Sequence, residues 1–362
     1  MKKKILFIVP LPPPVHGSSI VSQCIKNSKV IQERFDCDFI NLSTSRQIDE
    51  IGTISAVKLW RFFASYFILI YKLLFRKYDL CYLAITCYGI GFLKDAPFVI
   101  ICKIFRRKIV IHQHNKGMSR YVDRIFYKWL FTLVYQNTNV ILLSWKLYED
   151  IVKIVKREQV FICPNGIPFE MNKPIQRSNS IPQLLFLSNL METKGVFILL
   201  DACKSLHESG YKFTCKFVGG ETKEINSKKF SEEVKKRSLE SCVSYVGRKY
   251  GKEKIKEFIT SDIFVQPTYD DCFPLTLLEA MQLNLPVIST DQGAIAEMIE
   301  DGKTGLICKT KNSEDLVIKI KQLFDNPQLR LQFGNAGYDR FMTKYTLAHF
   351  EEHITACLSA IK

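Results

Sequence analysis

The carboxylates of Asp271 and Glu279 and an expected helix start lie together in the segment Asp270–Glu279 (DDCFPLTLLE). A predicted strand, Ile263–Gln266, ends just before it, and we expect a helix to start near Phe273–Pro274. The first amides of a helix lack intrahelical acceptors, so its N-terminus favours an anion such as a diphosphate. Asp271 could accept hydrogen bonds from hydroxyl groups, and Glu279 could hold a vicinal diol. The alternative is that Asp271 caps the helix and Glu279 is a solvated surface residue.

Two histidines and a glycine stand at the ends of other predicted strands. His112 and His114 end the run that starts at Ile109, and residues two apart in a strand face the same side. A metal site of the H-x-H type would need a third ligand, and a structural role satisfying loop carbonyls is the other alternative. Gly17, in the loop Pro12–Ser18 before an expected helix, allows a ligand to approach the backbone closely.

Short apolar runs alternate with longer helical stretches along the whole chain. This alternation is typical of parallel sheets with right-handed crossovers and helices on both faces. The predicted strands are Ile5–Val9, Phe39–Leu42, Leu80–Ile85, Ile109–His112, Val140–Ser144, Leu184–Leu187, Phe213–Val218, Val243–Gly247, Ile263–Gln266, Val287–Ser289 and Leu306–Cys308. The predicted helices include Val57–Phe75, Tyr121–Val134, Trp145–Val155, Val196–Ser209, Lys252–Thr260 and Leu316–Asn326.

So many strands indicate two doubly wound α/β domains rather than one. Phe169–Pro182 has no apolar periodicity and is rich in turn residues, which favours a linker. We predict an N-terminal acceptor-binding domain (1–168), a linker (169–182), a C-terminal nucleotide-sugar-binding domain (183–343) and a C-terminal helix (344–362) packing back toward the first domain. Ligands of doubly wound sheets bind beyond the carboxyl ends of the strands, so the cleft between the domains is the expected active site.

These segments resemble the motifs of family 4 glycosyltransferases, which have the GT-B fold of two Rossmann-like domains facing a central cleft. The segment from Asp271 to Glu279 is similar to the E-x7-E signature of that family. The resemblance extends over essentially the whole chain, through Pro12–Ser18, Pro164–Ile167, Ser188–Val196, Pro286–Gly293, Glu297 and Gly302–Gly305.

The resemblance implies roles for individual residues. Glu279 would bind the ribose of the nucleotide, and Asp271 with the amides of Phe273–Thr276 would hold the donor sugar and its phosphate. Lys194 would neutralise the leaving diphosphate, and His114 would orient a sugar hydroxyl and stabilise positive charge at the anomeric carbon. The expected catalytic residues are His114, Lys194 and Asp271; the donor-binding set is Gly17, Ser18, Asn189, Lys194, Asp271, Phe273, Pro274, Leu275, Thr276 and Glu279; His16, His112 and Lys116 are acceptor-side candidates.

Three positions depart from the family pattern. Asp271 stands where glutamate is usual, and its shorter reach bears on the sugar contact. Asn189 replaces an arginine, which leaves Lys194 as the only charged member of a pair normally placed on the diphosphate; outside this motif, a lysine before a helix is most simply a solvated side chain. Ser18 stands for the second glycine of its loop.

No metal or other cofactor is expected. Asp36 and Asp38 form a D-x-D string like that of the metal-dependent GT-A glycosyltransferases, but they open a predicted strand far from the donor motif. We interpret the string as coincidental. Lys194 and the helix N-terminus already supply the positive field that a divalent cation would give.

The basic character of the chain belongs to its N-terminal half. Residues 1–170 contain 25 Lys and Arg against 12 Asp and Glu, whereas the remainder contains 26 against 24. This predicts an anionic partner, and the absence of helix-turn-helix, zinc-finger and RNA-recognition patterns argues against nucleic acid. Within this half, Val57–Tyr78 combines eight aromatic residues with five Lys and Arg. It is either a helix buried against the sheet or an interfacial helix on an anionic membrane, a surface that the cluster Lys103–Lys108 could join.

The resemblance implies a retaining glycosyltransferase that moves a hexose-type sugar from a nucleoside diphosphate sugar to an acceptor hydroxyl. The basic, aromatic N-terminal half suggests a glycan or polyprenyl-diphosphate-linked acceptor, in capsule, O-antigen or related surface polysaccharide assembly. Twelve cysteines without a CxxC pair fit a reducing cytosol, so we expect a cytoplasmic protein, peripheral on the inner face of the membrane. A GT-B sugar-nucleotide epimerase and a non-catalytic sugar-nucleotide-binding scaffold are the alternatives.

Overall fold

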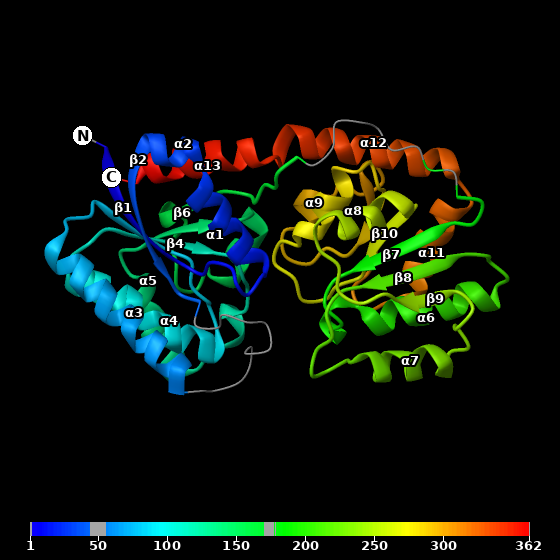
Figure 1. Ribbon diagram of the computed structural model, residues 1–362, viewed down its shortest axis with the longest axis horizontal. Helices are drawn as coiled ribbons and strands as arrows, with labels where there is room; N and C mark the ends of the chain where they lie inside the picture. The colour runs from blue at the N-terminus through cyan, green and yellow to red at the C-terminus, as the bar shows by residue number, and fades with distance from the viewer. Residues whose placement is uncertain (1, 44–55, 170–176, 178, 362) are drawn as a thin grey trace. The chain divides into compact units, whose positions relative to one another are not determined.

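A computed structural model describes residues 2–43, 56–169, 177 and 179–361, except for the side chains of residues 56–59. The chain divides into two compact units (Figure 1): unit 1 comprises Met1–Gly166 and Leu347–Lys362, and unit 2 comprises Ile167–Thr346. Each unit contains a six-stranded parallel sheet. The predicted class, a pair of doubly wound α/β domains, is confirmed.

The sheet of unit 1 is built from buried apolar runs. Its strand order is β2-β1-β3-β4-β5-β6, and every residue of β1 from Ile5 to Val9 is fully buried. Strands of this kind have both faces covered by helices, which explains the continuous apolar runs in the sequence. The strands are β1 (Lys3–Val9), β2 (Phe35–Asn41), β3 (Leu80–Leu83), β4 (Ile109–Gln113), β5 (Asn139–Leu142) and β6 (Val160–Ile162).

The helices of unit 1 differ from the sequence prediction at one place. The predicted helix Trp145–Val155 is wrong: Trp145–Asp150 is the 3₁₀ helix η3, and turns follow it. The β-branched residues Ile151, Val152, Ile154 and Val155 disfavour a continued α-helix. The other helices are α1 (Gly17–Asn27), α2 (Lys29–Arg34), α3 (Ala56–Phe75), α4 (Gly89–Ile104), η2 (Met118–Arg120), α5 (Ile125–Tyr135), η4 (Arg157–Gln159) and α13 (Leu347–Ala360).

The last helix of the chain completes unit 1. α13 packs against α2, and the Lys3 ammonium donates hydrogen bonds to the carbonyls of Leu358 (2.8 Å) and Ile361 (2.5 Å). The last carbonyls of a helix lack intrahelical donors and carry partial negative charge, so a lysine there is favourable. The first strand is thus fastened to the final helix.

The sheet of unit 2 reverses its strand order in the middle. The order is β12-β11-β10-β7-β8-β9, so the chain leaves β7 (Gln183–Leu187) in one direction and β10 (Ile263–Gln266) in the other. This is the switch point at which doubly wound sheets bind ligands. The remaining strands are β8 (Thr214–Val218), β9 (Val243–Tyr245), β11 (Val287–Ser289) and β12 (Gly305–Ile307); the helices are η5 (Glu192–Lys194), α6 (Val196–Glu208), α7 (Ser227–Lys236), α8 (Gly251–Thr260), α9 (Leu275–Met281), α10 (Ile295–Met298), α11 (Ser313–Phe324) and α12 (Pro327–Lys344).

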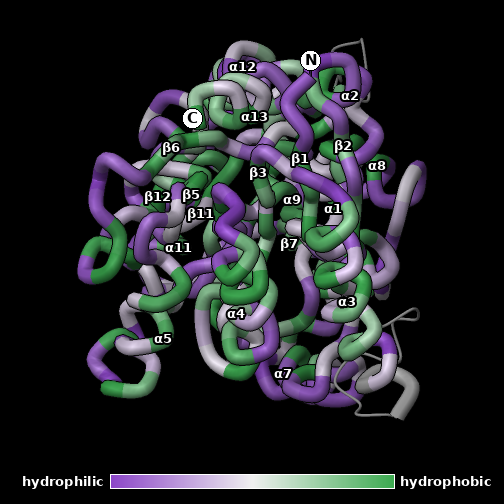
Figure 2. Tube along the Cα trace, turned by 90° about the vertical axis from the view of Figure 1, so that its left-hand side faces the viewer, coloured by the Kyte–Doolittle hydropathy of each residue, from purple (hydrophilic) through white to green (hydrophobic). Residues whose placement is uncertain are grey.

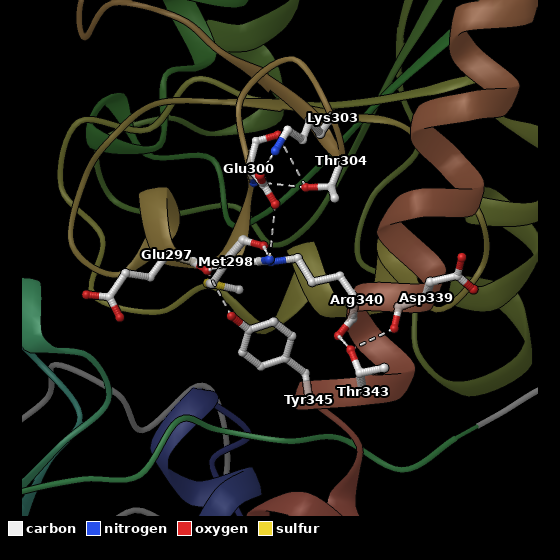
Figure 3. A network of polar contacts seen from close by, with 9 residues as sticks. All are labelled: Glu297, Met298, Glu300, Lys303, Thr304, Asp339, Arg340, Thr343 and Tyr345. Carbon is white, nitrogen blue, oxygen red and sulfur yellow. Dashed lines mark hydrogen bonds and ion pairs between the residues drawn. The ribbon is translucent and has the colours of Figure 1, made fainter.

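Helix α12 and Tyr345 after it are fastened to the end of α10 (Ile295–Met298) and to Glu300 beyond it (Figure 3). The Arg340 guanidinium donates to the carbonyl of Met298 (2.8 Å, from Nε) and to that of Glu297 (2.7 Å, from Nη2). A further nitrogen, Nη1, lies 3.6 Å from the Glu300 carboxylate, and the Tyr345 hydroxyl also donates to the carbonyl of Glu297 (3.0 Å). Four polar contacts therefore hold a segment that has little regular structure of its own.

Replacing Arg340 should destabilise unit 2. Arg340→Ala leaves the two carbonyls without their charged donor and is expected to lower the free energy of unfolding by about 2 kcal/mol. Urea denaturation checks this, with Gln332→Ala, an exposed site on the same helix, as the control. The control should change stability by less than about 0.5 kcal/mol. Equal midpoints for the two variants would contradict the assignment.

Candidate functional site

Lys194 and Asp271 meet at the carboxyl edge of the unit 2 sheet. The Lys194 Nζ lies 2.6 Å from Asp271 Oδ2 and donates to the carbonyl of Asp270 at 3.2 Å. The two side chains are 21% and 12% exposed, so the pair is largely withdrawn from solvent. The loops after β7 and β10, which flank the switch point, supply the two residues. The structure thus brings together the lysine and the carboxylate that the sequence placed at separate strand ends.

Backbone contacts hold these two loops against each other. The carbonyl of Thr193 accepts hydrogen bonds from the amide of Tyr269 (2.9 Å) and the hydroxyl of Thr268 (3.0 Å). Gly195 has a φ of +86°, and a Cβ there would lie 2.2 Å from the carbonyl oxygen of Pro267. Only glycine permits this approach, so it fixes the position of Lys194.

Asp271 is held on three sides. Its Oδ1 accepts from the backbone amide of Cys272 (2.9 Å), and its Oδ2 lies 3.5 Å from the side-chain nitrogen Nε2 of Gln266. Gly293, with a φ of +57°, passes so close that a Cβ would lie 2.4 Å from the carbonyl oxygen of Asp271.

Pro274, not Asp271, is the N-cap of α9. The alternative of Asp271 as a helix cap is therefore wrong.

The start of α9 carries the other predicted phosphate-binding residues. Helix α9 begins at Leu275, directly after Pro274, so the amides of Leu275 and Thr276 occupy its first turn. The Thr276 hydroxyl donates to Gln266 Oε1 at 2.8 Å, which ties this turn to β10. Phe273 is buried, with its ring centroid 6.1 Å from that of Tyr345.

Glu279 forms a second ion pair further along α9. Its Oε1 lies 2.7 Å from the Nζ of Lys254 on α8, and its side chain is 16% exposed. The alternative of a solvated surface residue is therefore wrong. Lys254 was not singled out in the sequence, because nothing in its neighbourhood distinguishes it from the other lysines of an amphipathic helix.

Asn189 lies beside an arginine that the sequence analysis did not identify. The Asn189 side-chain oxygen accepts from the amide of Gly220 at 3.2 Å. The guanidinium of Arg248 covers Gly220 so closely that a Cβ there would lie 2.0 Å from Nη2. Two glycines in sequence, Gly219 and Gly220, are the signal that could have indicated a close contact here.

The predicted histidines lie together at the carboxyl edge of the unit 1 sheet. The ring centroids of His112 and His114 are 4.1 Å apart, and the Tyr82 hydroxyl contacts Nδ1 of His112. In the part of the chain that the structure describes, His112 Nε2 and both ring nitrogens of His114 are buried and lack hydrogen-bond partners. The described residues contain no group of three or more potential metal ligands. The role of satisfying loop carbonyls is not seen for His114.

His114, His16 and Ser18 line one cavity of about 300 Å³. His16 is the N-cap of α1, and its Nδ1 lies 3.0 Å from the Ser18 hydroxyl. A Cβ on Gly17 would meet nothing within 4 Å, so packing within the unit does not require glycine there.

Asp95 of α4 also lines this cavity and was missed in the sequence. It is 4% exposed and its Oδ2 accepts from the amide of Thr86 at 2.9 Å. The sequence signal was its place as the only acidic residue of an apolar helix. Lys116, the remaining acceptor-side candidate, follows His114 on a loop that Asp150 holds by accepting from the amides of Gly117 (2.8 Å) and Met118 (3.0 Å).

Asp38 of the D-x-D string has a structural role. It accepts from Lys72 (2.6 Å), Arg76 (2.8 Å) and the hydroxyl of Tyr78 (2.6 Å), which fastens the end of α3 to β2. Burial alone would raise the pKa of Asp38, but the hydrogen bonds and charges of these partners outweigh it and lower the pKa. These contacts support the interpretation of the string as coincidental.

Comparison with known proteins identifies the family of the C-terminal half. Residues 169–340 match the family model described as glycosyl transferases group 1, which confirms the resemblance seen in the motifs. The amylovoran biosynthesis glycosyltransferase AmsK of Erwinia amylovora is 29% identical over 175 residues, 46% of this chain and 42% of AmsK. The matched segment covers less than half the length of such curated relatives.

Solved structures resemble the chain over nearly its full length. Sucrose-phosphate synthase from Thermosynechococcus elongatus is 15% identical, with a TM-score of 0.79 over 99% of this chain and 98% of that one. HepE of Anabaena, in complex with UDP and glucose, is 16% identical, with a TM-score of 0.73 over 99% and 100% of the two chains. These likenesses confirm the predicted GT-B fold.

The buried histidines predict a loss of stability in acid. Burial and the charge of His16 lower the pKa of His114 to about 3. The unfolded chain therefore takes up a proton below about pH 6.5 that the folded chain does not, and stability falls from there towards pH 3. In urea titrations between neutral pH and mild acid, His114→Gln should lose stability less steeply than the native protein. His207→Gln, on an exposed part of α6, is the control; parallel slopes for His114→Gln and the native protein would refute the prediction.

Proposed function

We propose that this protein moves a sugar from a nucleoside diphosphate sugar to an acceptor hydroxyl with retention of configuration. The match of its C-terminal half to the group 1 glycosyl transferases supports this proposal. The observation that carries the proposal is the Lys194–Asp271 pair beside the start of α9, with Glu279 further along the same helix. A cation, free helix amides and a carboxylate in this order suit a diphosphate followed by a ribose.

The donor is expected to replace the internal partners of these residues. The diphosphate would take the Lys194 ammonium and the first amides of α9, and the ribose hydroxyls would bind Glu279. Asp271 would then accept hydrogen bonds from the sugar. HepE, which shares the fold, was crystallised with UDP and glucose, which supports a nucleotide of this class.

The proposed chemistry is a front-face displacement. The bond between the anomeric carbon and the leaving phosphate breaks while the acceptor oxygen attacks from the same face, and the acceptor proton passes to the phosphate. Positive charge develops on the sugar and negative charge on the leaving group. Lys194 and the α9 amides would stabilise the negative charge, and neutral His114 would orient a sugar hydroxyl, so the proposal requires no metal.

We assign the acceptor to the cavity of unit 1 that contains His16, Asp95 and His114. Its buried Asp95 carboxylate and the imidazoles of His16 and His114 suit the hydroxyl groups of a glycan. AmsK, to which the C-terminal half is similar, is named for amylovoran biosynthesis, which supports surface polysaccharide assembly as the process. All twelve cysteines are free, as in a protein of a reducing compartment, and this supports the cytoplasmic side.

Helix α3 supports a peripheral membrane contact. One of its faces is buried: Tyr66 packs on Phe98 of α4 with ring centroids 4.4 Å apart, and Leu69 and Leu73 are buried. The opposite face is exposed and consists of Trp60, Phe63, Phe67, Tyr71, Leu74 and Phe75, each more than half exposed. Figure 2 shows hydrophobic residues along much of α3. The described residues contain no helix that could cross a membrane. We infer that α3 lies on an anionic membrane surface.

Lys194→Ala tests the donor site. A panel of nucleoside diphosphate sugars is first screened for protection of the native protein against thermal unfolding, because a bound donor raises stability by mass action. With the donor so identified, Lys194→Ala should lower the transfer rate by about 10²- to 10³-fold. Lys249→Ala, whose ammonium pairs with Glu253 at 3.5 Å, is the control and should retain the native rate.

The same assay separates the alternatives. Free epimerised sugar without a new glycoside would indicate an epimerase. A scaffold would bind nucleotide without turnover, and Lys194→Ala would leave its biological activity unchanged. Either result would reject the proposed transferase.

Replacing the outer aromatic residues of α3 should abolish membrane binding. The triple variant Trp60→Ser, Phe67→Ser and Tyr71→Ser removes the exposed rings and leaves the inner face intact, so folding should be kept. It is expected not to float with vesicles of phosphatidylcholine and phosphatidylglycerol, whereas the native protein does. Ile318→Ser with Leu331→Ser, at exposed apolar sites of unit 2, is the control. Equal flotation of the triple variant and the native protein would contradict the assignment.

A further inference from the structure

A basic hollow of about 1410 Å³ lies at the amino ends of the unit 1 strands, at the edge of the sheet opposite to the histidines. The starts of β1 and β2, the segments after α3 and α4, and the end of α13 form its walls. Eight of its 17 lining residues are Lys or Arg, and two, Asp36 and Asp79, are acidic. Neither the donor site nor the acceptor cavity includes any of these residues.

The two acidic residues do not neutralise this charge. Lys4 engages both of them: its amide donates to Asp79 Oδ2 at 2.7 Å, and its Nζ lies 3.9 Å from Asp36. Burial, followed by the positive charge of Lys108, lowers the pKa of Lys3, although Asp79 acts in the opposite direction. The cations of the hollow therefore disfavour one another, and an anion bound among them would relieve this repulsion.

Three of the cations are available to such an anion. Within the described part of the chain, Lys77, Arg106 and Lys108 form no ion pair, and all three are exposed. Arg107 is already engaged, since its Nη2 donates to the carbonyl of Leu73 at 3.3 Å. Arginine and lysine grouped around a hollow bind phosphate oxygens by charge-assisted hydrogen bonds.

Exposed apolar side chains lie close to cations of this hollow: Phe75 lines an adjoining cavity that shares Lys77 with it, and Ile104 is close to Arg106 in the sequence. Helices α3 and α4 end at this edge with Phe75 and Ile104, each 71% exposed. Lys77 follows Phe75 by two residues, and Arg106 follows Ile104 by two residues. Cations placed directly beside exposed apolar side chains are the arrangement of an interfacial lipid contact, and a free anion would need only the cations.

We propose that this hollow binds the phosphate headgroup of an anionic phospholipid, with Lys77, Arg106 and Lys108 on the phosphate and Phe75 and Ile104 at the acyl boundary. This inference rests on the proposed membrane contact and adds a headgroup site to it. It makes unit 1 bind the membrane at two places with different chemistry: the apolar face of α3, and a cationic site at the strand amino ends.

The test is the double variant Arg106→Gln with Lys108→Gln. Binding is measured to vesicles of phosphatidylcholine alone and of equimolar phosphatidylcholine and phosphatidylglycerol. We expect the variant to lose about 10- to 30-fold in affinity for the anionic vesicles, and most of the salt dependence, while its weak binding to neutral vesicles is unchanged. Lys228→Gln with Lys235→Gln, at exposed sites of α7, changes the net charge equally and should bind as the native protein does.

Several outcomes would overturn the proposal. One is an equal loss in the α7 control, which would indicate net charge rather than a site. Others are protection of the native protein by inorganic phosphate as effective as that by vesicles, or binding of a single-stranded oligonucleotide that the double variant abolishes. Thermal unfolding confirms that the variant is folded. The membrane contact of α3 is tested separately, because only the α3 variant should lose binding to neutral vesicles. Failure of the proposed headgroup site can therefore be distinguished from failure of the proposed α3 contact.

Discussion

Parallel strand pairing is the constraint on which the rest of each unit depends. Neighbouring strands run in the same direction, so every connection crosses a face of the sheet and all strands end at one edge. At the switch point of unit 2 the connections from β7 and β10 depart to opposite sides of the sheet, so the loops that start them lie next to each other. Lys194 and Asp271, 77 positions apart in the sequence, meet there for this topological reason.

The loops at this edge are fixed by close backbone approach rather than by regular structure. Gly195 and Gly293 allow contacts that any side chain would prevent. They hold Lys194 and Asp271 as a largely buried ion pair. Separating such a pair without compensation is costly, so a ligand that enters between them has to satisfy both charges. A molecule carrying an anionic group and neighbouring hydroxyls meets that requirement, and this is the physical basis of the proposed specificity.

Much of the fold could be predicted because it depends on local pattern. Short apolar runs such as Ile5–Val9 and Ile263–Val265 are typical of strands buried on both faces. The motif around Asp271 and Glu279 was identifiable for a similar reason, since a strand, a turn and a helix start follow one another within a short segment. The strand β6 was missed, because three residues, Val160–Ile162, give too short a pattern.

The rest of the site depends on contacts distant in sequence. Lys254, Arg248 and Asp95 gain their positions only when separate helices and loops pack together. The immediate neighbours of Lys254 and Arg248 give no sign of it, and the one local signal of Asp95 is its place in an apolar helix. The segment Trp145–Val155 has the apolar spacing of a helix, but β-branched residues and the hydrogen bonds of Asp150 to the loop after β4 favour turns. Which residues of α3 are buried and which are exposed could likewise not be predicted without knowing which face of the helix packs on α4.

The attachment of Lys3 to the end of α13 has a consequence for synthesis on the ribosome. Unit 1 is assembled from both ends of the chain, and unit 2 is inserted between them. Strand β1 is translated before unit 2, whereas the carbonyls of Leu358 and Ile361 that its lysine binds are translated after unit 2. Unit 2 is continuous and can fold as it emerges, whereas unit 1 can complete its core only after α13 has been released. We therefore expect unit 2 to complete its fold before unit 1, although most of unit 1 is translated earlier.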